Sequence, residues 1–244
     1  MSVAVLGDIH SNLAALEAVL WQLDELRIQR ILFAGDLVGY NASPAECIHL
    51  FQQRNGVGIS GNHDRYATGQ EMRDVRESTV EAVEYTRRAI ADADLEFLRQ
   101  LPDQRLVDER YMVVHGSILD RDQYMLSAEV INNNLKAMHS GYAGIDICFF
   151  GHSHFPAVIG NGKVDMKFPA TRTVKLDPLK QYMINPGSVG QPRDGVALTS
   201  FAIFDPKAYA VTIIRVPYDV QDSHDRVIKA GLGRNLAERL LAGR

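Results

Sequence analysis

The sequence has few cysteines and no long apolar run. Only 2 of its 244 residues are cysteine, too few for the disulfide framework of a small secreted domain. We therefore interpret Cys47 and Cys148 as ordinary core residues of a protein from a reducing compartment. No apolar run approaches the roughly 20 residues that a membrane-spanning helix needs. The first expected strand begins two residues after Met1, which leaves no room for a leader. These absences predict a cytoplasmic protein.

The chain also lacks a strong excess of charge of one sign. Its 26 Lys and Arg residues against 30 Asp and Glu residues give a formal net charge of −4. A protein that wraps duplex nucleic acid carries a basic footprint, so we expect no stable binding of a duplex, although cleavage of short oligonucleotides stays open. Hydrophobic residues make up 46% of the chain, which can fill a substantial core. We expect one domain over residues 1–244. The oligomeric state is left open.

Strand and helix signals alternate through the first half of the chain. Short apolar runs that predict buried strands are Val3–Leu6, Ile31–Ala34, Val57–Ser60, Met112–Val114 and Ile147–Phe150. Apolar residues at a 3.6-residue period predict a helix from Leu13 to Leu26, with Ser11 or Asn12 as its cap. For Asn12, a contact with substrate is the alternative to capping. Further helices are expected near Pro44–Arg54, Thr79–Ala91 and Asp94–Leu101.

The pattern changes from Val158 onward, where short β-type runs are separated by Gly, Pro and Asp turns. These runs are Lys163–Phe168, Thr173–Leu176, Tyr182–Asn185, Ser200–Phe204 and Ala210–Val216. They predict a second, largely antiparallel sheet. The tail from about Asp222 predicts one terminal helix, which Gly231 and Gly233 weaken. The whole pattern favours an α/β fold, a four-layer α/β/β/α sandwich of two mixed sheets flanked by helices.

Metal-binding residue types follow the five strands of the first half. The motifs are GDIH at Gly7–His10, GDLVG at Gly35–Gly39, GNHD at Gly61–Asp64, VHG at Val114–Gly116 and GHSH at Gly151–His154. We expect these ligands to converge, because strand ends meet at one edge of an open α/β sheet. Carboxylate, amide and imidazole donors without thiolate suit Mn, Fe, Ni, Co or Zn ions better than a structural zinc site. The candidate ligands are Asp8, His10, Asp36, Asn62, His115, His152 and His154.

Seven donors are too many for one ion. A mononuclear catalytic zinc uses three protein ligands and keeps a position for water. Seven donors can hold two divalent transition-metal ions if one carboxylate bridges them, and Asp36 is the candidate bridge. A single motif histidine is most simply interpreted as a structural hydrogen-bonding residue, but the convergence of seven donors argues against that interpretation. His49, His139 and His224 follow no strand, and we interpret them as structural.

The ordered motifs D-x-H, GD, GNHD, H and GHSH resemble those of the calcineurin-like metallophosphoesterases over Val3–His154. The following segment NPGSVGQPRDG, Asn185–Gly195, resembles the small prokaryotic branch of that family. This branch includes phosphodiesterases and relatives of diadenosine polyphosphate hydrolases. The resemblance implies one metal site formed by Asp8, His10, Asp36 and His154, and a second formed by Asp36, Asn62, His115 and His152.

The donors also suggest a mechanism, in which a metal-bridging hydroxide attacks phosphorus while the ions hold the phosphate oxygens. We expect His63, next to the ligand Asn62, to protonate the leaving group, with Asp64 orienting or charging it. Asn62 is expected to contact substrate as well. Arg193 could bind a substrate phosphate through its planar donor fork. A weak surface ion pair with Asp194 is the alternative.

These residues predict a phosphoesterase that acts on phosphodiesters or small phosphate esters. The alternatives are a nucleotide polyphosphate hydrolase of the diadenosine tetraphosphate type, a protein phosphatase, and a catalytically silent scaffold of the same fold. Residues 118–141 are expected to form either a lid that shapes the leaving-group pocket or a surface helix. The helical spacing that favours the second interpretation is that of Ala128, Ile131, Leu135 and Met138.

Overall fold

The computed structural model describes residues 1–142 and 144–244. Its strands are β1 (Val3–Leu6), β2 (Ile31–Phe33), β3 (Val57–Gly58), β4 (Gln104–Val107), β5 (Tyr111–Val114), β6 (Ile147–Phe149), β7 (Ala157–Gly160), β8 (Lys163–Asp165), β9 (Arg172–Lys175), β10 (Tyr182–Asn185), β11 (Thr199–Asp205) and β12 (Ala210–Val216). Its helices are α1 (Leu13–Glu25), α2 (Pro44–Gln53), α3 (Asn62–Ala67), α4 (Glu77–Ala89), α5 (Asp92–Gln100), α6 (Ala128–Gly141), α7 (Val220–Lys229) and α8 (Arg234–Ala242).

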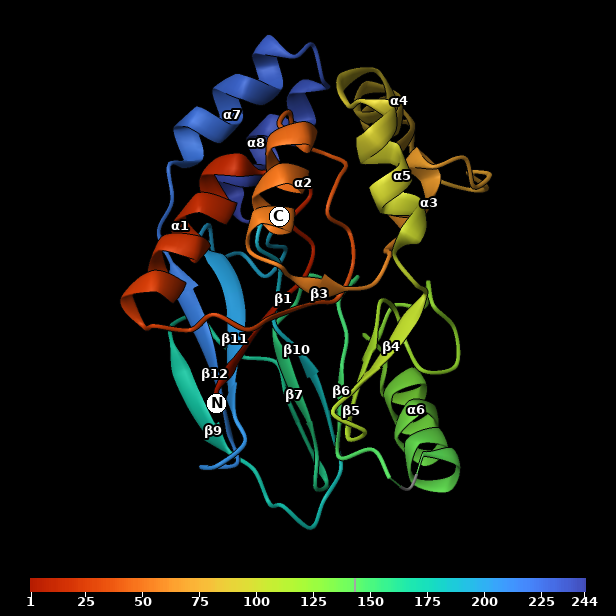
Figure 1. Ribbon diagram of the computed structural model, residues 1–244, viewed down its shortest axis with the longest axis vertical. Helices are drawn as coiled ribbons and strands as arrows, with labels where there is room; N and C mark the ends of the chain where they lie inside the picture. The colour runs from red at the N-terminus through yellow and green to blue at the C-terminus, as the bar shows by residue number, and fades with distance from the viewer. Residues whose placement is uncertain (143) are drawn as a thin grey trace.

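The strands form two six-stranded sheets (Figure 1), with the orders β3-β2-β1-β11-β12-β9 and β4-β5-β6-β10-β7-β8. Side chains alternate between the two faces of each strand. Leu6 therefore packs with α1 and α2 on the outer face of the first sheet, whereas Val5 packs toward the second sheet. In the second sheet, Phe149 points into the layer between the sheets, and Met112 packs against α6. The predicted four-layer α/β/β/α sandwich is confirmed.

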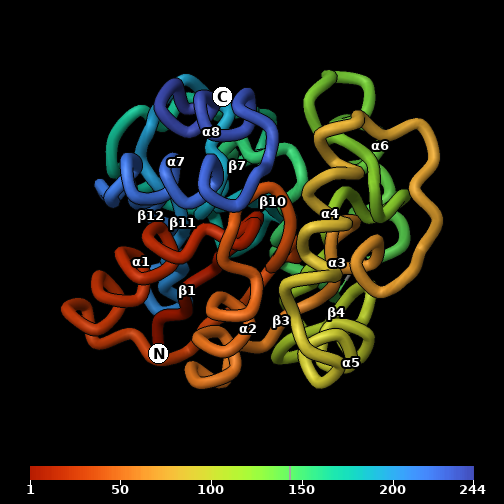
Figure 2. Tube along the Cα trace, turned by 90° about the horizontal axis from the view of Figure 1, so that it is seen from above, coloured from red at the N-terminus to blue at the C-terminus, as the bar shows by residue number. Residues whose placement is uncertain are grey.

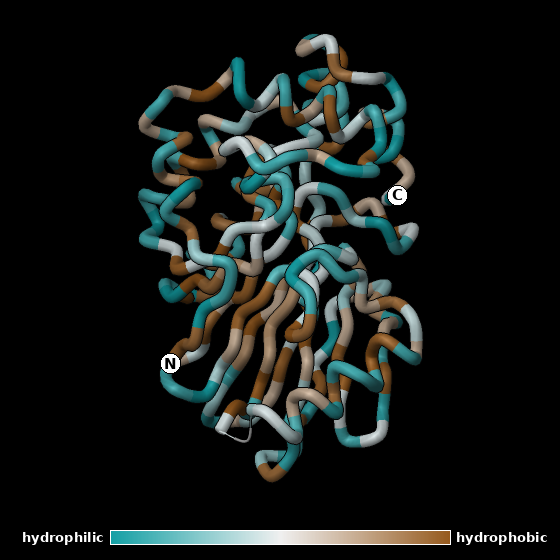
Figure 3. Tube along the Cα trace, turned by 90° about the vertical axis from the view of Figure 1, so that its right-hand side faces the viewer, coloured by the Kyte–Doolittle hydropathy of each residue, from teal (hydrophilic) through white to brown (hydrophobic). Residues whose placement is uncertain are grey.

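The helices cover the outer faces of both sheets. Seen from above, α1 and α7 lie beside the first sheet, and α6 lies toward the opposite side of the molecule (Figure 2). Hydrophobic residues are concentrated along the strands, and hydrophilic residues dominate the connecting loops (Figure 3). None of the helices in residues 1–142 and 144–244 combines the length and apolar character of a membrane span. Cys47 and Cys148 are buried free thiols in separate parts of the core.

The strands of the second half do not form a separate antiparallel sheet, contrary to the prediction. Strands β9, β11 and β12 join the first sheet, where β11 runs antiparallel to β1. Strands β7, β8 and β10 join the second sheet, where β10 runs parallel to β6. Each sheet therefore combines strands from both halves of the chain. The apolar pattern of a strand predicts its two faces but not its neighbours, which depend on contacts distant in sequence.

Three local predictions also need correction or completion. The tail forms two helices, α7 and α8, because Gly231 between them adopts the left-handed conformation, with φ +74°. Helix α3 begins within GNHD and was not among the expected helices. Asn12 is the cap of α1, since its side chain accepts a hydrogen bond from the Ala15 N–H at 3.2 Å.

Phe149 offers a test of the layer between the sheets. It is fully buried, and its ring lies near those of Tyr111 and Phe204. We expect Phe149→Ala to lower the free energy of unfolding by about 3–5 kcal/mol, because the lost ring leaves a cavity. Urea denaturation measures the change. The control Leu179→Ala alters a side chain that is 89% exposed and should cost less than about 0.5 kcal/mol. Equal losses in both variants would contradict this core.

Candidate metal centre

The seven candidate ligands converge at the ends of strands from both sheets. Each is at most 9% exposed. Asp8 and His10 follow β1, Asp36 follows β2, Asn62 begins α3 just after β3, His115 follows β5, and His152 and His154 follow β6. Parallel strands bring these chain segments to one edge, so residues up to 146 positions apart in sequence become neighbours. The predicted convergence is therefore present in the fold.

The ligand atoms form two clusters that share Asp36. His10 Nε2 and His154 Nε2 are 3.1 Å apart, and His115 Nε2 and His152 Nδ1 are also 3.1 Å apart. Asp36 Oδ2 lies 3.5 Å from His10 Nε2 and 3.3 Å from His115 Nε2. One carboxylate oxygen thus stands between the two pairs of imidazoles.

Asp8 and Asn62 each complete one cluster. Asp8 Oδ1 is 3.6 Å from His154 Nε2, and Asn62 Oδ1 is 3.0 Å from His115 Nε2. The first cluster therefore contains two carboxylates and two imidazoles. The second contains a carboxylate, an amide oxygen and two imidazoles. This is the division of ligands that the family resemblance implies.

Backbone carbonyl groups decide which ring nitrogen carries the proton in three of the histidines. His10 Nδ1 donates to Val38 O at 3.1 Å, His115 Nδ1 to Ala34 O at 2.8 Å, and His154 Nδ1 to Gln191 O at 2.5 Å. A carbonyl oxygen only accepts, so in the neutral form of each ring, the form that binds a metal, Nε2 points a lone pair into the centre. Burial lowers the pKa of both His10 and His154. Their Nε2 lone pairs therefore face each other with no proton between them.

Divalent cations fit this arrangement of lone pairs. Two nitrogens that bind one ion at about 2.0–2.1 Å and at right angles lie about 3 Å apart, close to both observed nitrogen–nitrogen distances. Burial raises the pKa of Asp36, but its electrostatic interactions with the imidazoles of His115, His63 and His10 outweigh this effect and hold the pKa well below its usual range. Asp36 is therefore ionised. Asp8 Oδ2 is buried and has no hydrogen-bond partner in the parts of the chain that are described.

The backbone around the centre is held in conformations that non-glycine residues rarely adopt. Left-handed φ values occur at Asp8 (+53°), His10 (+46°), Asp36 (+63°), His152 (+65°) and His154 (+61°). Such conformations cost about 1–3 kcal/mol each and are typical of functional sites. Neighbouring glycines provide the space: a Cβ on Gly61 would lie 2.1 Å from Asp36 Oδ1. The tight turns aim the ligands at one point.

His63 lies at the edge of the first cluster. Its ring centroid is 4.8 Å from that of His10 and 4.3 Å from that of Tyr40. A ring nitrogen of His63 lies within 4.8 Å of ligand atoms of His10 and Asp36. Nδ1 is enclosed and has no hydrogen-bond partner among residues 1–142 and 144–244, and a Cβ on Gly39 would lie 2.2 Å from it. Burial lowers the pKa of His63 to about 4.

Asp64 is not the hydrogen-bond partner of His63, so this part of the prediction was wrong. Its Oδ1 accepts from the N–H groups of Leu37 (2.9 Å) and Val38 (3.1 Å), and its Oδ2 from those of Asp36 and Gly61 (both 2.9 Å). Both carboxylate oxygens are used to join the turn that carries Asp36 to the start of α3. Asp64 therefore positions the candidate ligands Asp36 and Asn62.

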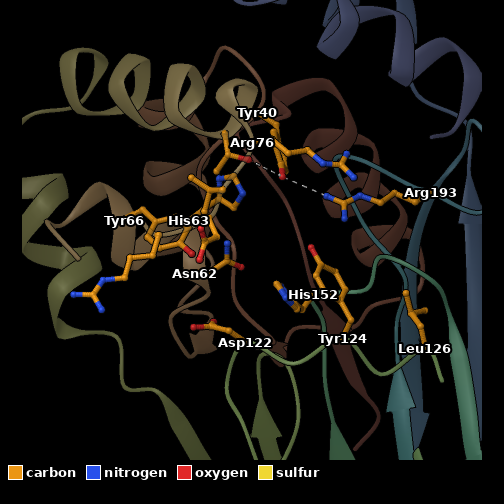
Figure 4. Close-up of a pocket in the computed structure, with 14 residues that line it drawn as sticks. Tyr40, Asn62, His63, Tyr66, Arg76, Asp122, Tyr124, Leu126, His152 and Arg193 are labelled. Atoms are coloured by element: carbon orange, nitrogen blue, oxygen red, sulfur yellow. Dashed lines mark hydrogen bonds between the residues drawn. The ribbon is translucent and has the colours of Figure 1, made fainter. Parts of the chain in front are cut away.

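A cavity of about 520 Å³ opens over the centre. In Figure 4, Tyr40, Asn62 and His63 occupy one wall, and His152 and Tyr124 face them. The Tyr124 ring stacks on the ligand His152 with 4.0 Å between centroids. Sequence reasoning missed Tyr40 as a lining residue, and the only available signal was its position directly after GDLVG.

Residues 118–141 divide into two parts. Asp122, Tyr124 and Leu126 line the cavity, whereas α6 packs Met138 against the second sheet. Arg65 on α3 donates to the carboxylate of Asp122 and thereby ties this loop to the helix that begins with Asn62. A closing movement of the segment stays a prediction.

Arg193 reaches the cavity and does not form the expected alternative ion pair with Asp194. Its Nη2 donates to Gln191 Oε1 at 3.1 Å and to Tyr40 Oη at 3.5 Å. Its Nε is buried, with no partner in residues 1–142 and 144–244. Asp194 pairs with Arg215 instead. Arg193 therefore keeps donor capacity beside the metal centre.

The fold and this set of ligands are those of a metallophosphoesterase. Residues 1–208 match the model of the calcineurin-like phosphoesterase superfamily domain. The chain belongs to this superfamily, whose members are in general metal-dependent phosphoester hydrolases. The resemblance seen in the motifs is confirmed.

Similar proteins cover the whole chain. It is 36% identical over 248 positions to an uncharacterized protein of Methanocaldococcus jannaschii, with 99% of this chain and 98% of the relative aligned. A metallophosphoesterase from Sphaerobacter thermophilus has a similar structure, with a TM-score of 0.86, 34% identity, and 100% and 99% coverage. A hypothetical protein from Pyrococcus horikoshii shares the fold, with a TM-score of 0.83, 20% identity, and 100% and 98% coverage.

The positioning role of Asp64 can be tested by Asp64→Asn. The amide replaces one carboxylate oxygen by an NH2 donor, so two of the four N–H groups lose their acceptor, and each costs about 1–3 kcal/mol when buried without a partner. We expect a lower free energy of unfolding and a lower Mn²⁺ content after equilibrium dialysis, measured by urea denaturation and mass spectrometry of the metal. The control Asp94→Asn changes another buried aspartate, which caps α5 and pairs with His49. It should leave Mn²⁺ content unchanged. Wild-type metal content in Asp64→Asn would contradict this role.

Proposed function

We propose that the protein hydrolyses phosphodiesters or small phosphate esters with the help of two divalent transition-metal ions. The position of Asp36 Oδ2, within 3.5 Å of an Nε2 atom in each cluster, is the observation that carries this proposal. It supports a bridging role for Asp36. The proposed ligands are Asp8, His10, Asp36 and His154 for one ion, and Asp36, Asn62, His115 and His152 for the other. The donor set is compatible with Mn, Fe, Ni, Co or Zn.

When bound, such a pair of ions activates water as the nucleophile and neutralises charge on the phosphate oxygens. The protein supplies proton transfer and orientation. His63 Nδ1 is enclosed, so we assign the donated proton to Nε2, from which it passes to the leaving oxygen. An anionic substrate beside this ring favours its protonated form. The Nε–H of Arg193, which has no partner in the described part of the chain, is available to a phosphate oxygen of the substrate.

The intact ligand set, with His63 beside it, favours an enzyme over a silent scaffold. We propose a small phosphate ester or nucleotide as the ligand and no stable binding of duplex nucleic acid, which the net charge of −4 supports. A cytoplasmic location is also proposed, supported by the two buried free thiols. Diadenosine tetraphosphate and phosphoproteins are the competing substrates.

The proposed function predicts metal-dependent turnover of bis-(p-nitrophenyl) phosphate. Metal-stripped protein should be inactive, and reloading with Mn²⁺, Ni²⁺, Fe²⁺ or Zn²⁺ should restore activity. A parallel assay with diadenosine tetraphosphate compares ester and anhydride cleavage. Faster cleavage of the anhydride would indicate that the substrate is a nucleotide polyphosphate and not a phosphodiester. Protein that binds metal and hydrolyses neither compound would contradict this proposal.

Proton donation by His63 predicts a dependence on the leaving group. His63→Ala should keep its metal, and its rate of hydrolysis of a diester with an alkyl leaving group should fall by a factor of about 10²–10⁴. The loss should be much smaller on bis-(p-nitrophenyl) phosphate, whose leaving group needs little protonation. The control His49→Ala removes a half-exposed histidine that pairs with Asp94 and should keep the wild-type rates. Equal losses on both substrates in His63→Ala would exclude the general acid role.

A further inference from the structure

One part of the cavity carries more positive charge than a single reacting phosphate balances. Arg76 and Arg193 both line the cavity, and their guanidinium groups appear in the same part of Figure 4, on the side of Tyr40. Neither takes part in an ion pair in residues 1–142 and 144–244. Two cations without carboxylate partners therefore face this space.

Arg193 is held in place and still has a free donor. Its Cζ lies 5.7 Å from the centroid of the Tyr40 ring, and its Nη2 contacts the Tyr40 hydroxyl. The same hydroxyl lies 3.5 Å from Thr79 Oγ1, in the first turn of α4. These contacts fix the guanidinium while Nε has no partner among the described residues. A buried donor without a partner is costly in a protein and calls for an acceptor from a ligand.

Arg76 adds a second cation at the N-terminus of α4. It is the N-cap of this 13-residue helix, which has no side-chain capping hydrogen bond. Val75, Arg76 and Thr79 all line the cavity. The N-terminus of a helix carries a partial positive charge and free N–H groups, which favour anions. The N-terminus of the helix and the two arginines thus all attract an anion to this part of the cavity.

A third guanidinium lies within electrostatic range. Burial, followed by the positive charge of Arg193, lowers the pKa of Arg239 on α8, and the charge of Arg76 acts in the same direction. The cavity wall also contains two carboxylates, Asp74 and Asp122. The charge of Asp122 is neutralised by its ion pair with Arg65. Asp74 is the other carboxylate of the wall and lies in an exposed turn. Positive charge therefore dominates this part of the cavity.

We propose that Arg76, Arg193 and the N-terminus of α4 form a subsite for a second phosphate of the substrate, beside the phosphate that reacts at the metal centre. This inference rests on the proposed function and specifies its substrate class. The substrate is a phosphate ester or anhydride with two phosphate groups, such as a nucleotide. A substrate with one phosphate leaves Arg76 without an anionic partner.

The subsite is tested by comparing ligands that differ in one phosphate. Isothermal titration calorimetry on Mn²⁺-loaded protein gives the Kd of adenosine 5′-monophosphate, adenosine 5′-diphosphate and adenosine 3′,5′-bisphosphate. Because charge-assisted hydrogen bonds are the strong ones, we expect at least one two-phosphate ligand to bind about tenfold or more tightly than the monophosphate. Arg76→Gln should reduce this ratio to about threefold or less.

Arg73→Gln is the matched control. Arg73 lines the same cavity and lies in the same loop, but it pairs with Glu71, so this variant should keep the wild-type ratio. A ratio near one in wild-type protein would overturn the subsite. An equal decrease of this ratio in Arg76→Gln and Arg73→Gln would also overturn the subsite, because the general electrostatic attraction of the cavity for anions would then explain the binding.

The calorimetric ratio does not depend on turnover, so the two proposals fail in different ways. A retained ratio in protein that hydrolyses none of the substrates would contradict the proposed hydrolase and support the subsite. Active protein with a ratio near one would keep the hydrolase and refute the subsite.

Discussion

The opposed lone pairs of His10 and His154 are the constraint on which the site depends. Their Nδ1 atoms donate to the carbonyl groups of Val38 and Gln191, so two Nε2 lone pairs meet at 3.1 Å. Two such atoms repel unless a cation lies between them, because each carries negative partial charge in a low-dielectric interior. Asp36 adds a full negative charge at the same place. The folded protein therefore holds several electron-donor atoms so close together that a bound cation would stabilise them.

The surrounding fold maintains this unfavourable arrangement. Strand ends from both sheets aim the ligands, and left-handed turns at Asp8 and Asp36 hold them. Asp64 ties the Asp36 turn to α3 through backbone N–H groups. Ser188 Oγ and the N–H of Gly190 both donate to the carbonyl oxygen of Asp8, at 2.8 and 2.9 Å. The strained backbone of these turns lowers the stability of the fold, and in return it holds the candidate metal ligands in a preorganised arrangement.

The convergence of the candidate ligands and the layers could be predicted from the sequence because both follow local patterns. Each ligand lies directly after an apolar run, and the order of motifs marks the family. Strand partners in the second half could not be predicted, because pairing of β11 with β1 depends on contacts distant in sequence. The role of Asp64 depends on backbone N–H groups from the segment that follows β2. Arg76 belongs to the cavity only through folding, since no spacing distinguishes it from other surface residues.

Anomalous X-ray diffraction from Mn²⁺-loaded crystals tests the central claim most directly. Two peaks about 3.5–4 Å apart, on opposite sides of Asp36 Oδ2, are the predicted result. One peak should lie between His10 and His154, and the other between His115 and His152. A single peak, or none between His10 and His154 at saturating Mn²⁺, would contradict a dinuclear centre bridged by Asp36.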